Sequence, residues 1–205
     1  MIHVSVTGSS AESGGGIYLE SWCADFLITS CSFVHNRASM GGGLVSFVDG
    51  LIIQESVIES NVAVASHGGM MVEDSNDVVV RNSFVSRNVA GISSGGLSIS
   101  NSVNATIEST EFVANEGLSG SGGALFISDS SAIFVRNTSF VQNYAAVAGG
   151  AAFVGTFSNV LFVDAMWLEN RAGASGGALY ITESDKVDLQ GNDFSRNRVE
   201  TESGS

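Results

Sequence analysis

A two-part mark returns seven times along this chain and constrains its fold more than any other feature of the sequence. The first part is a Gly-Gly pair followed by a mostly apolar run, with repeats starting near residues 15, 42, 68, 95, 122, 149 and 176. The second glycines of successive pairs are 27, 26, 27, 27, 27 and 27 residues apart. A fixed period of this size is typical of repeat architectures, in which every unit is one small supersecondary element.

The second part of the mark is an apolar residue followed three places later by an asparagine, about 20 residues after each glycine pair. The apolar residue and the asparagine are Phe33/Asn36, Ile58/Asn61, Val85/Asn88, Phe112/Asn115, Phe140/Asn143, Trp167/Asn170 and Phe194/Asn197. Two marks that stay in step through seven units indicate that the units are structurally equivalent.

Each unit divides into short apolar runs. In the fifth unit they cover residues 124–128, 132–135 and 138–141, and in the seventh they cover 178–182, 187–189 and 193–195. Turns rich in Gly, Ser, Asn and Asp separate the runs, and the chain has no proline. Runs this short fit strands and leave no room for helices of about 12 residues. The pattern predicts an all-β fold, a parallel β-helix of about seven coils with three strands in each coil.

Coils of a parallel β-helix stack at ~4.8 Å, so equivalent residues stand above one another. The asparagines are therefore expected to form a hydrogen-bonded ladder along the axis, with the apolar residues in interior columns and the glycines at a tight corner. The inward-facing positions of the first strand stay open. Leu125 and Ile127 favour one register, whereas Leu97 and Ile99 favour the other, and a slip of one residue exchanges the two faces.

No linker interrupts the repeats, so residues 1–200 are predicted to form a single solenoid segment and residues 201–205 a polar tail. The alternation of Ile2, Val4 and Val6 with polar neighbours predicts that the first residues complete a preceding coil. The pattern shows no helical cap, and we expect the chain to be a segment of a longer protein.

The paired marks resemble the repeats of chlamydial polymorphic outer-membrane proteins and of similar repeat proteins elsewhere. Their signature combines Gly-Gly-Ala and an aliphatic residue with Phe-x-x-Asn. The strict forms occur here at Gly122–Leu125, Gly176–Leu179, and at Phe33, Phe112, Phe140 and Phe194. The resemblance implies a right-handed helix and a surface-exposed region with a role in adhesion. It implies no catalytic residue, because these motif residues shape the coil.

The charge balance narrows the possible partners. The formal net charge is −13, from 21 acidic and 8 basic residues, and the sequence has no basic cluster. Nucleic acid is therefore excluded as an expected partner. Membrane insertion is excluded too, because no run of about 18 apolar residues occurs.

Acidic residues recur after the first strand of the units, and solvated turn carboxylates are the favoured interpretation, with a cation site as the alternative. They are Glu20, Asp49, Glu73, Asp74, Asp129, Glu183 and Asp185. His3, His35 and His67 lie in different units and are expected at the surface or in turns. Several arginines adjoin turn asparagines, where they are expected to cover carbonyls or pair with carboxylates. We therefore expect no enzyme, no metal and no cofactor.

Cys23 and Cys31 are too few for a disulfide framework, so free buried thiols are expected, with one disulfide within the first coil as the alternative. Two acceptor triplets for glycosylation occur near predicted turns, at Asn104 and at Asn137. A glycan could project outward from either position.

These features favour a non-enzymatic extracellular or cell-surface module, an adhesin or rigid spacer with a protein or glycan partner. The first alternative is a β-helix that binds carbohydrate or cleaves it as a polysaccharide lyase or hydrolase. A groove with stacked aromatic rings and converging carboxylates would favour that alternative. The second is a filament element that stacks through its open ends on coils of its parent or of another copy.

Overall fold

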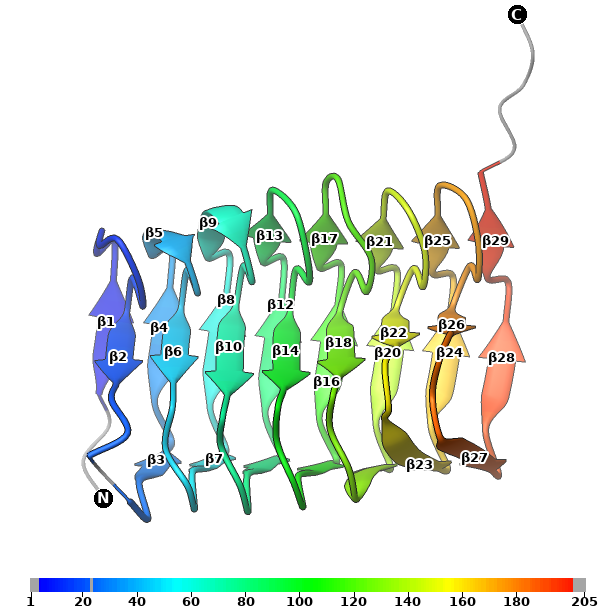
Figure 1. Ribbon diagram of the computed structural model, residues 1–205. Coiled ribbons are helices and arrows are strands. Elements are labelled where there is room, and N and C mark those ends of the chain that lie inside the picture. The colour runs from blue at the N-terminus through cyan, green and yellow to red at the C-terminus, as the bar shows by residue number, and fades with distance from the viewer. Residues whose placement is uncertain (1–3, 23, 201–205) are drawn as a thin grey trace, which may run out of the picture.

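In the computed structural model, which describes residues 4–22 and 24–200, the chain winds into a rod of stacked coils (Figure 1). Each coil contributes one strand to each of four sheets, and every strand pairs in parallel with its equivalents in the adjacent coils. The described residues contain no helix, so they offer none that could cross a membrane. The all-β parallel solenoid expected from the sequence is confirmed.

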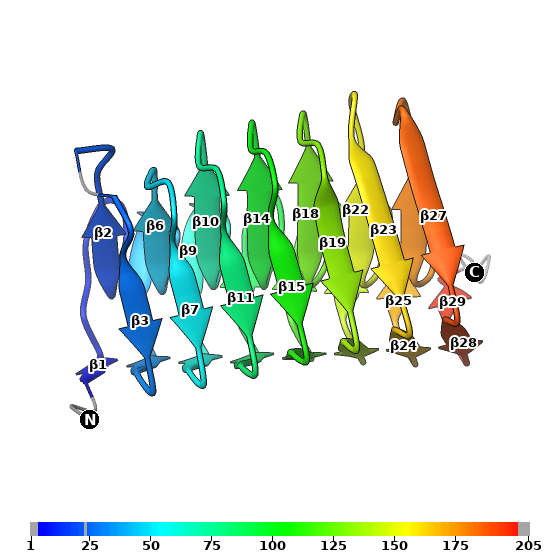
Figure 2. The same cartoon turned by 90° about the horizontal axis from the view of Figure 1, so that it is seen from below.

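The four sheets follow one another around each coil, and Figure 2 shows the second sheet in front. The first sheet contains β2 (Ile17–Leu19), β6 (Leu44–Ser46), β10 (Met70–Glu73), β14 (Leu97–Ser100), β18 (Leu125–Ser128), β22 (Ala152–Val154) and β26 (Leu179–Ile181). The second contains β3 (Leu27–Thr29), β7 (Ile52–Gln54), β11 (Val79–Arg81), β15 (Thr106–Glu108), β19 (Ile133–Arg136), β23 (Asn159–Val163) and β27 (Lys186–Gln190).

The third sheet contains β1 (Ser5–Thr7), β4 (Ser32–Val34), β8 (Val57–Glu59), β12 (Phe84–Ser86), β16 (Glu111–Val113), β20 (Ser139–Val141), β24 (Met166–Leu168) and β28 (Asp193–Ser195). The fourth contains β5 (Arg37–Met40), β9 (Val62–Ser66), β13 (Val89–Ala90), β17 (Glu116–Gly117), β21 (Tyr144–Ala145), β25 (Arg171–Ala172) and β29 (Arg198–Val199). The three strands per coil expected from the sequence are present. The fourth is an addition, since strands of two residues such as β17 have no apolar pattern to reveal them.

β1 confirms that the first residues belong to a preceding coil. It pairs with β4, so Val6 lies opposite Phe33. Ser9 then occupies the position that asparagine takes in the later coils, and its backbone N–H donates to Asn36 Oδ1 at 2.9 Å.

The pairing of the first sheet settles the register that the sequence left open. Leu97 lies opposite Leu125, and Ile99 opposite Ile127, so all four side chains share the inward register. The repeat is therefore 28 residues long at this point, from Gly95 to Gly123. The spacing between second glycines does not reveal this longer repeat, because Gly96 is structurally equivalent to Ala124 and not to Gly123. The hydrogen bond from Leu97 N–H to the Ala124 carbonyl, at 2.7 Å, shows this equivalence.

One glycine column at the corner before the first sheet is sterically required. A Cβ built on Gly123 would lie 2.2 Å from the Gly150 carbonyl oxygen in the next coil and 2.4 Å from the Tyr144 carbonyl oxygen. No side chain fits between backbones this close. The residue equivalent to Gly123 in each coil therefore marks a place where the backbones of neighbouring coils pass close together.

The interior is filled by columns of apolar side chains that run along the axis. In the third sheet Phe112 and Phe140 stack with ring centroids 5.2 Å apart, Trp167 follows at 4.3 Å, and Phe194 at 5.2 Å. Rings held face to face in this way add attraction beyond the area that they bury. The apolar member of the second mark is therefore a core residue, as expected.

The asparagine member of the mark forms a continuous ladder, which confirms the central structural expectation. Asn36, Asn61, Asn88, Asn115, Asn143 and Asn170 are buried, and Asn197 is partly buried. The Nδ2 group of Asn115 donates to Asn143 Oδ1 at 3.1 Å and to the Val85 carbonyl at 2.9 Å. Asn115 Oδ1 in turn accepts from both the backbone N–H and the Nδ2 group of Asn88.

This geometry also explains the spacing of the Phe-x-x-Asn motif. Each Nδ2 group donates to the carbonyl of the apolar motif residue one coil earlier, as Asn61 does to Phe33 at 2.9 Å. The same residue thus supplies a ring to the core and a carbonyl to the ladder.

Two further polar columns went unrecognised in the sequence because their members vary between Ser, Thr and Cys. One runs through Cys31, Ser56, Ser83, Thr110 and Thr138, whose side chains donate to the carbonyl two residues earlier. The other includes Ser75, Ser102 and Ser130 and accepts backbone N–H groups from the neighbouring coil. These columns satisfy buried backbone groups at the remaining corners.

The ladder makes a testable prediction about stability. Replacing Asn115 by Ala removes a ladder partner from the Asn88 N–H and from the Val85 carbonyl, which should lower the free energy of unfolding by roughly 2–6 kcal/mol. Urea unfolding, followed by circular dichroism, measures this change. Glu183→Gln is the control, because Glu183 is exposed, and it should change the free energy little. Equal, small effects would remove the ladder from this account of stability.

Candidate binding surfaces

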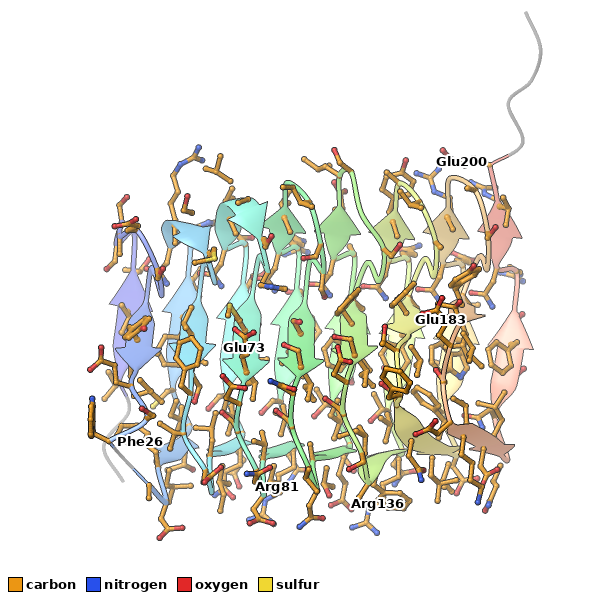
Figure 3. All side chains as sticks on the ribbon, in the orientation of Figure 1. Phe26, Glu73, Arg81, Arg136, Glu183 and Glu200 are labelled. Atoms are coloured by element: carbon orange, nitrogen blue, oxygen red, sulfur yellow. The ribbon has the colours of Figure 1, made fainter. Side chains whose placement is uncertain are left out.

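The acidic residues expected after the first strand lie along the connection between the first and second sheets. Figure 3 shows Glu73 and Glu183 on this side of the rod. Two members have polar partners one coil away: Asp49 Oδ1 accepts from Asn76 N–H at 2.6 Å, and Asp74 Oδ1 accepts from Asn101 Nδ2 at 2.7 Å. We call Glu20, Asp49, Glu73, Asp74, Asp129, Glu183 and Asp185 the acidic edge.

Carboxylates of the acidic edge do not gather into a metal site in the part of the chain that the structure describes. No group of three or more His, Cys, Asp or Glu side chains there could hold a metal ion. Burial and the charge of Asp74 raise the pKa of the Glu73 carboxyl above its usual value. This edge therefore carries negative charge that the neighbouring amides solvate without neutralising.

The arginines pair with glutamates in neighbouring coils, as the sequence predicts. Arg136 lies 2.7 Å from Glu108, and Arg87 pairs in the same way with Glu59. Exposed pairs of this kind contribute little to stability individually. Arg81 instead donates to Gln54, and Figure 3 places both Arg81 and Arg136 along the outer edge of the second sheet.

Three arginines converge near the end of the rod. Arg171, Arg196 and Arg198 line a hollow of about 400 Å³ together with Gln142 and Glu169. Hydrogen bonds from Gln142 and Arg196 lower the pKa of Glu169, and Arg171 pairs with Glu200 at 3.3 Å. Much of the basic charge in this hollow is thus already engaged by carboxylates.

The histidines and cysteines have structural settings. His3 and Cys23 lie outside the described residues. His35 is exposed in a turn, as expected. Cys31 is a free, partly buried thiol that donates to the Thr29 carbonyl at 3.2 Å, in place of the hydroxyl that its column carries in the next coils. This agrees with the expectation of a free thiol at Cys31.

His67 occupies an unusual position. Its φ is +65°, at a corner where Gly41 and Gly122 supply the positive φ in other coils. Its Nδ1 lies 3.5 Å from Ser93 Oγ, and the ring is largely buried. Burial lowers the pKa of His67 from 6.5 to about 4. The described geometry gives it no acidic partner of the kind that a nucleophilic triad requires.

The two glycosylation triplets begin at exposed turn residues. Asn104 and Asn137 have φ values of +61° and +52°, and both side chains are accessible. Asn104 Nδ2 donates to Asp77 Oδ1 at 2.5 Å. Attachment of a glycan at either residue stays a prediction.

Aromatic rings occur on the outer face of the first sheet, which the sequence analysis did not anticipate. Phe126 and Phe153 stack with centroids 4.9 Å apart and planes 4° apart, and Tyr180 follows at 5.7 Å. Because these rings cover one another's faces, they present mainly their edges to solvent. A sugar stacks on an open ring face, so this column is a poor platform for carbohydrate.

A second group of outward aromatic residues lies where the acidic edge meets the start of the first sheet. Tyr18, Trp22 and Phe47 line a hollow of about 280 Å³ with Glu20, Ser21 and Asp74. The Tyr18 and Phe47 rings are tilted by 55°, with centroids 5.9 Å apart, so they do not stack on each other. One feature of the sequence could have indicated this hollow, namely a tryptophan in a polar turn. The sequence does not show which residues of the neighbouring coils complete the hollow.

The stacked parallel sheets and the buried ladder define a solenoid repeat protein, and comparison with known proteins identifies its class. Residues 2–165 match the model of the right handed beta helix region, so the chain belongs to the right-handed β-helix family. No curated protein and no solved structure matches the chain. Membership establishes the architecture and the right-handed winding of the coils. It does not define an activity, because one fold can carry different functional sites on its surface.

The setting of His67 makes a prediction about pH. A histidine whose pKa is lowered on folding takes up its proton in the unfolded state first, so stability should fall as the pH drops from 6.5 towards about 4. The contribution lost is at most about 3 kcal/mol.

His67→Asn removes the titrating imidazole and with it this pH-dependent contribution to stability, and asparagine tolerates the positive φ. Thermal unfolding of both proteins across this pH range measures the difference. The variant should lose less stability than the wild type on acidification, and parallel curves would contradict a neutral, buried His67.

Proposed function

We propose that the chain is a non-enzymatic module, extracellular or displayed at a cell surface, that acts as a rigid spacer or adhesin. The observation that carries this proposal is the unbroken ladder from Ser9 to Asn197, which ties each coil to the next. A rod held together in this way presents its outer side chains in fixed columns. Such a surface suits recognition of a protein or a glycan.

The chain also fits the repeat type of the polymorphic outer-membrane proteins. Both halves of that signature have structural roles in this protein: the Phe-x-x-Asn residues supply core rings and ladder amides, and the Gly-Gly-Ala residues form the close passage at the corner. The resemblance supports display at a cell surface and a role in adhesion. The net charge of −13 supports an exposed, well-solvated rod.

The placement of the ionisable groups supports a non-enzymatic role. Carboxylates on the acidic edge accept from amides one coil away, and the arginines pair with glutamates along the rod. General acid–base chemistry on a glycan requires two carboxylates to face one another across a scissile bond. An assay for polysaccharide cleavage therefore tests the alternative function, a carbohydrate-active β-helix, directly.

The proposal predicts saturable binding without turnover. The purified chain is applied to a glycan array and to immobilised surface proteins, and to a panel of neutral and acidic polysaccharides with and without Ca²⁺. Binding to a glycan or protein with unchanged polysaccharide chain lengths is the expected result. The wild-type chain unfolded in urea and then applied under the same denaturing conditions serves as the control for binding that needs the intact rod.

Formation of products that stops on chelation would overturn the non-enzymatic role. It would point to a catalytic cation on the acidic edge. Absence of any binding partner on the array and among the surface proteins would contradict the adhesive role and leave the spacer role.

A further inference from the structure

The hollow at the start of the acidic edge combines features that the rest of the rod does not share. We call it the aromatic–acidic hollow; its lining comprises Tyr18, Glu20, Ser21, Trp22, Phe47 and Asp74. The residues come from the ends of three consecutive strands of the first sheet, β2, β6 and β10, which stacking brings together. The site therefore exists only in the folded solenoid.

The aromatic side chains of this hollow are unusually open to solvent. Trp22 is 90% exposed and Tyr18 is 44% exposed, whereas the other tryptophan, Trp167, is fully buried in the core. Leaving an indole in water forfeits the favourable transfer of a large apolar surface. Aromatic side chains that gather around one hollow, as Tyr18, Trp22 and Phe47 do, form a candidate binding surface.

The charge of the hollow is negative and not balanced locally. Glu20 and Asp74 line it, and no arginine or lysine is among the described residues of its lining. The Asp74 carboxylate accepts a hydrogen bond from a neutral amide, that of Asn101. Burial raises the pKa of the neighbouring Glu73, and the negative charge of Asp74 raises it further.

The arginine-lined hollow at the other end of the rod provides a contrast. There Glu169 lies 3.1 Å from Arg196, so its carboxylate already has a cationic partner. In the aromatic–acidic hollow no described lining residue provides a cationic partner for Glu20 or Asp74. A ring face attracts a cation through its quadrupole, and a carboxylate attracts it through its charge, so both parts of the lining favour the same ligand.

We propose that the aromatic–acidic hollow binds an organic cation, an alkylammonium or guanidinium group. A hollow of about 280 Å³ is large enough for such a head group. Trp22 and Tyr18 supply ring faces, and Glu20 and Asp74 supply the negative charge. A neutral sugar could stack on the rings and donate its hydroxyl groups to the carboxylates, but only a cation is also attracted by their charge.

Cation binding would deepen the proposed function, because it names the class of ligand that the module recognises. It rests on the proposed function only where the cation is assigned to a cell surface or to a partner protein. The cation has two possible sources with the same chemistry: a quaternary ammonium head group, or a lysine or arginine side chain of a partner protein. Binding of the isolated cation can be measured without any cell surface. A chain that binds the cation but no surface would contradict the adhesive role and leave the site intact.

The test uses the fluorescence of Trp22, which is exposed and should respond to a ligand, while the buried Trp167 gives a constant background. The full chain is titrated with choline, with N-acetyl-lysine methyl ester and with the corresponding arginine ester. The neutral control is 3,3-dimethylbutanol, which has the shape of choline without its charge. Saturable changes with at least one cation and none with the neutral analogue are expected.

Which cation binds most tightly distinguishes the two sources. Preference for choline indicates a quaternary ammonium head group, and preference for the amino-acid esters indicates a protein side chain. Either preference supports the site. Equal responses to choline and its neutral analogue, binding of neutral oligosaccharides in place of cations, or no saturable change with any cation would overturn it.

Variants localise the binding. Asp74→Asn should weaken cation affinity about tenfold, since it removes a carboxylate from the lining. Trp22→Ala, followed by calorimetry because the reporter is lost, should weaken it comparably, and at 90% exposure its removal should leave folding intact. Asp129→Asn is the matched control in an equivalent turn of the acidic edge. Unchanged affinity in Asp74→Asn, or equal losses in it and in Asp129→Asn, would contradict this location.

Discussion

The hydrogen bonds of the buried asparagine amides are the interaction on which the rest of this structure depends. Each amide from Asn61 to Asn170 accepts two N–H groups from the coil before it and donates to the coil after it. A missing member would therefore leave buried polar groups without partners. An unsatisfied buried group costs about 1–3 kcal/mol, which accounts for an asparagine at this position in every coil from Asn36 to Asn197. Ser9 and Asn197 extend the series to the two ends of the described chain.

Because the ladder holds the coils in register, every other property of the rod also comes in columns. The core rings stack from Phe112 to Phe194, the corner glycines follow one another, and Cys31 replaces a hydroxyl within a Ser/Thr column. The same rule governs the surface. Whether a carboxylate is neutralised depends on the residue one coil away, so Glu108 meets Arg136 while Asp74 meets an amide.

Most side chains on the surface of the rod belong to regular columns, so residues that depart from the repeat give a local surface its own chemical character. Trp22 lies in a turn that departs from those of the later coils, and the open ring faces beside it contrast with the mutually covered rings of Phe126 and Phe153. The right-handed β-helix provides a rigid framework, and the aromatic–acidic hollow, where we propose that a cation binds, is a departure from its regular columns.

The sequence by itself determined the architecture. The glycine pairs, the Phe-x-x-Asn spacing and the short apolar runs repeat visibly, and a period read seven times identifies the ladder asparagines and the core rings without coordinates. Only the tertiary structure decided the register around Gly95 and Gly123, the fourth strand of each coil, the Ser/Thr columns and the hollow formed by Tyr18, Phe47 and Asp74. The reason is physical: these features arise from residues about one coil apart in the chain, and which of them meet depends on how the coils align, including one extra residue in a turn.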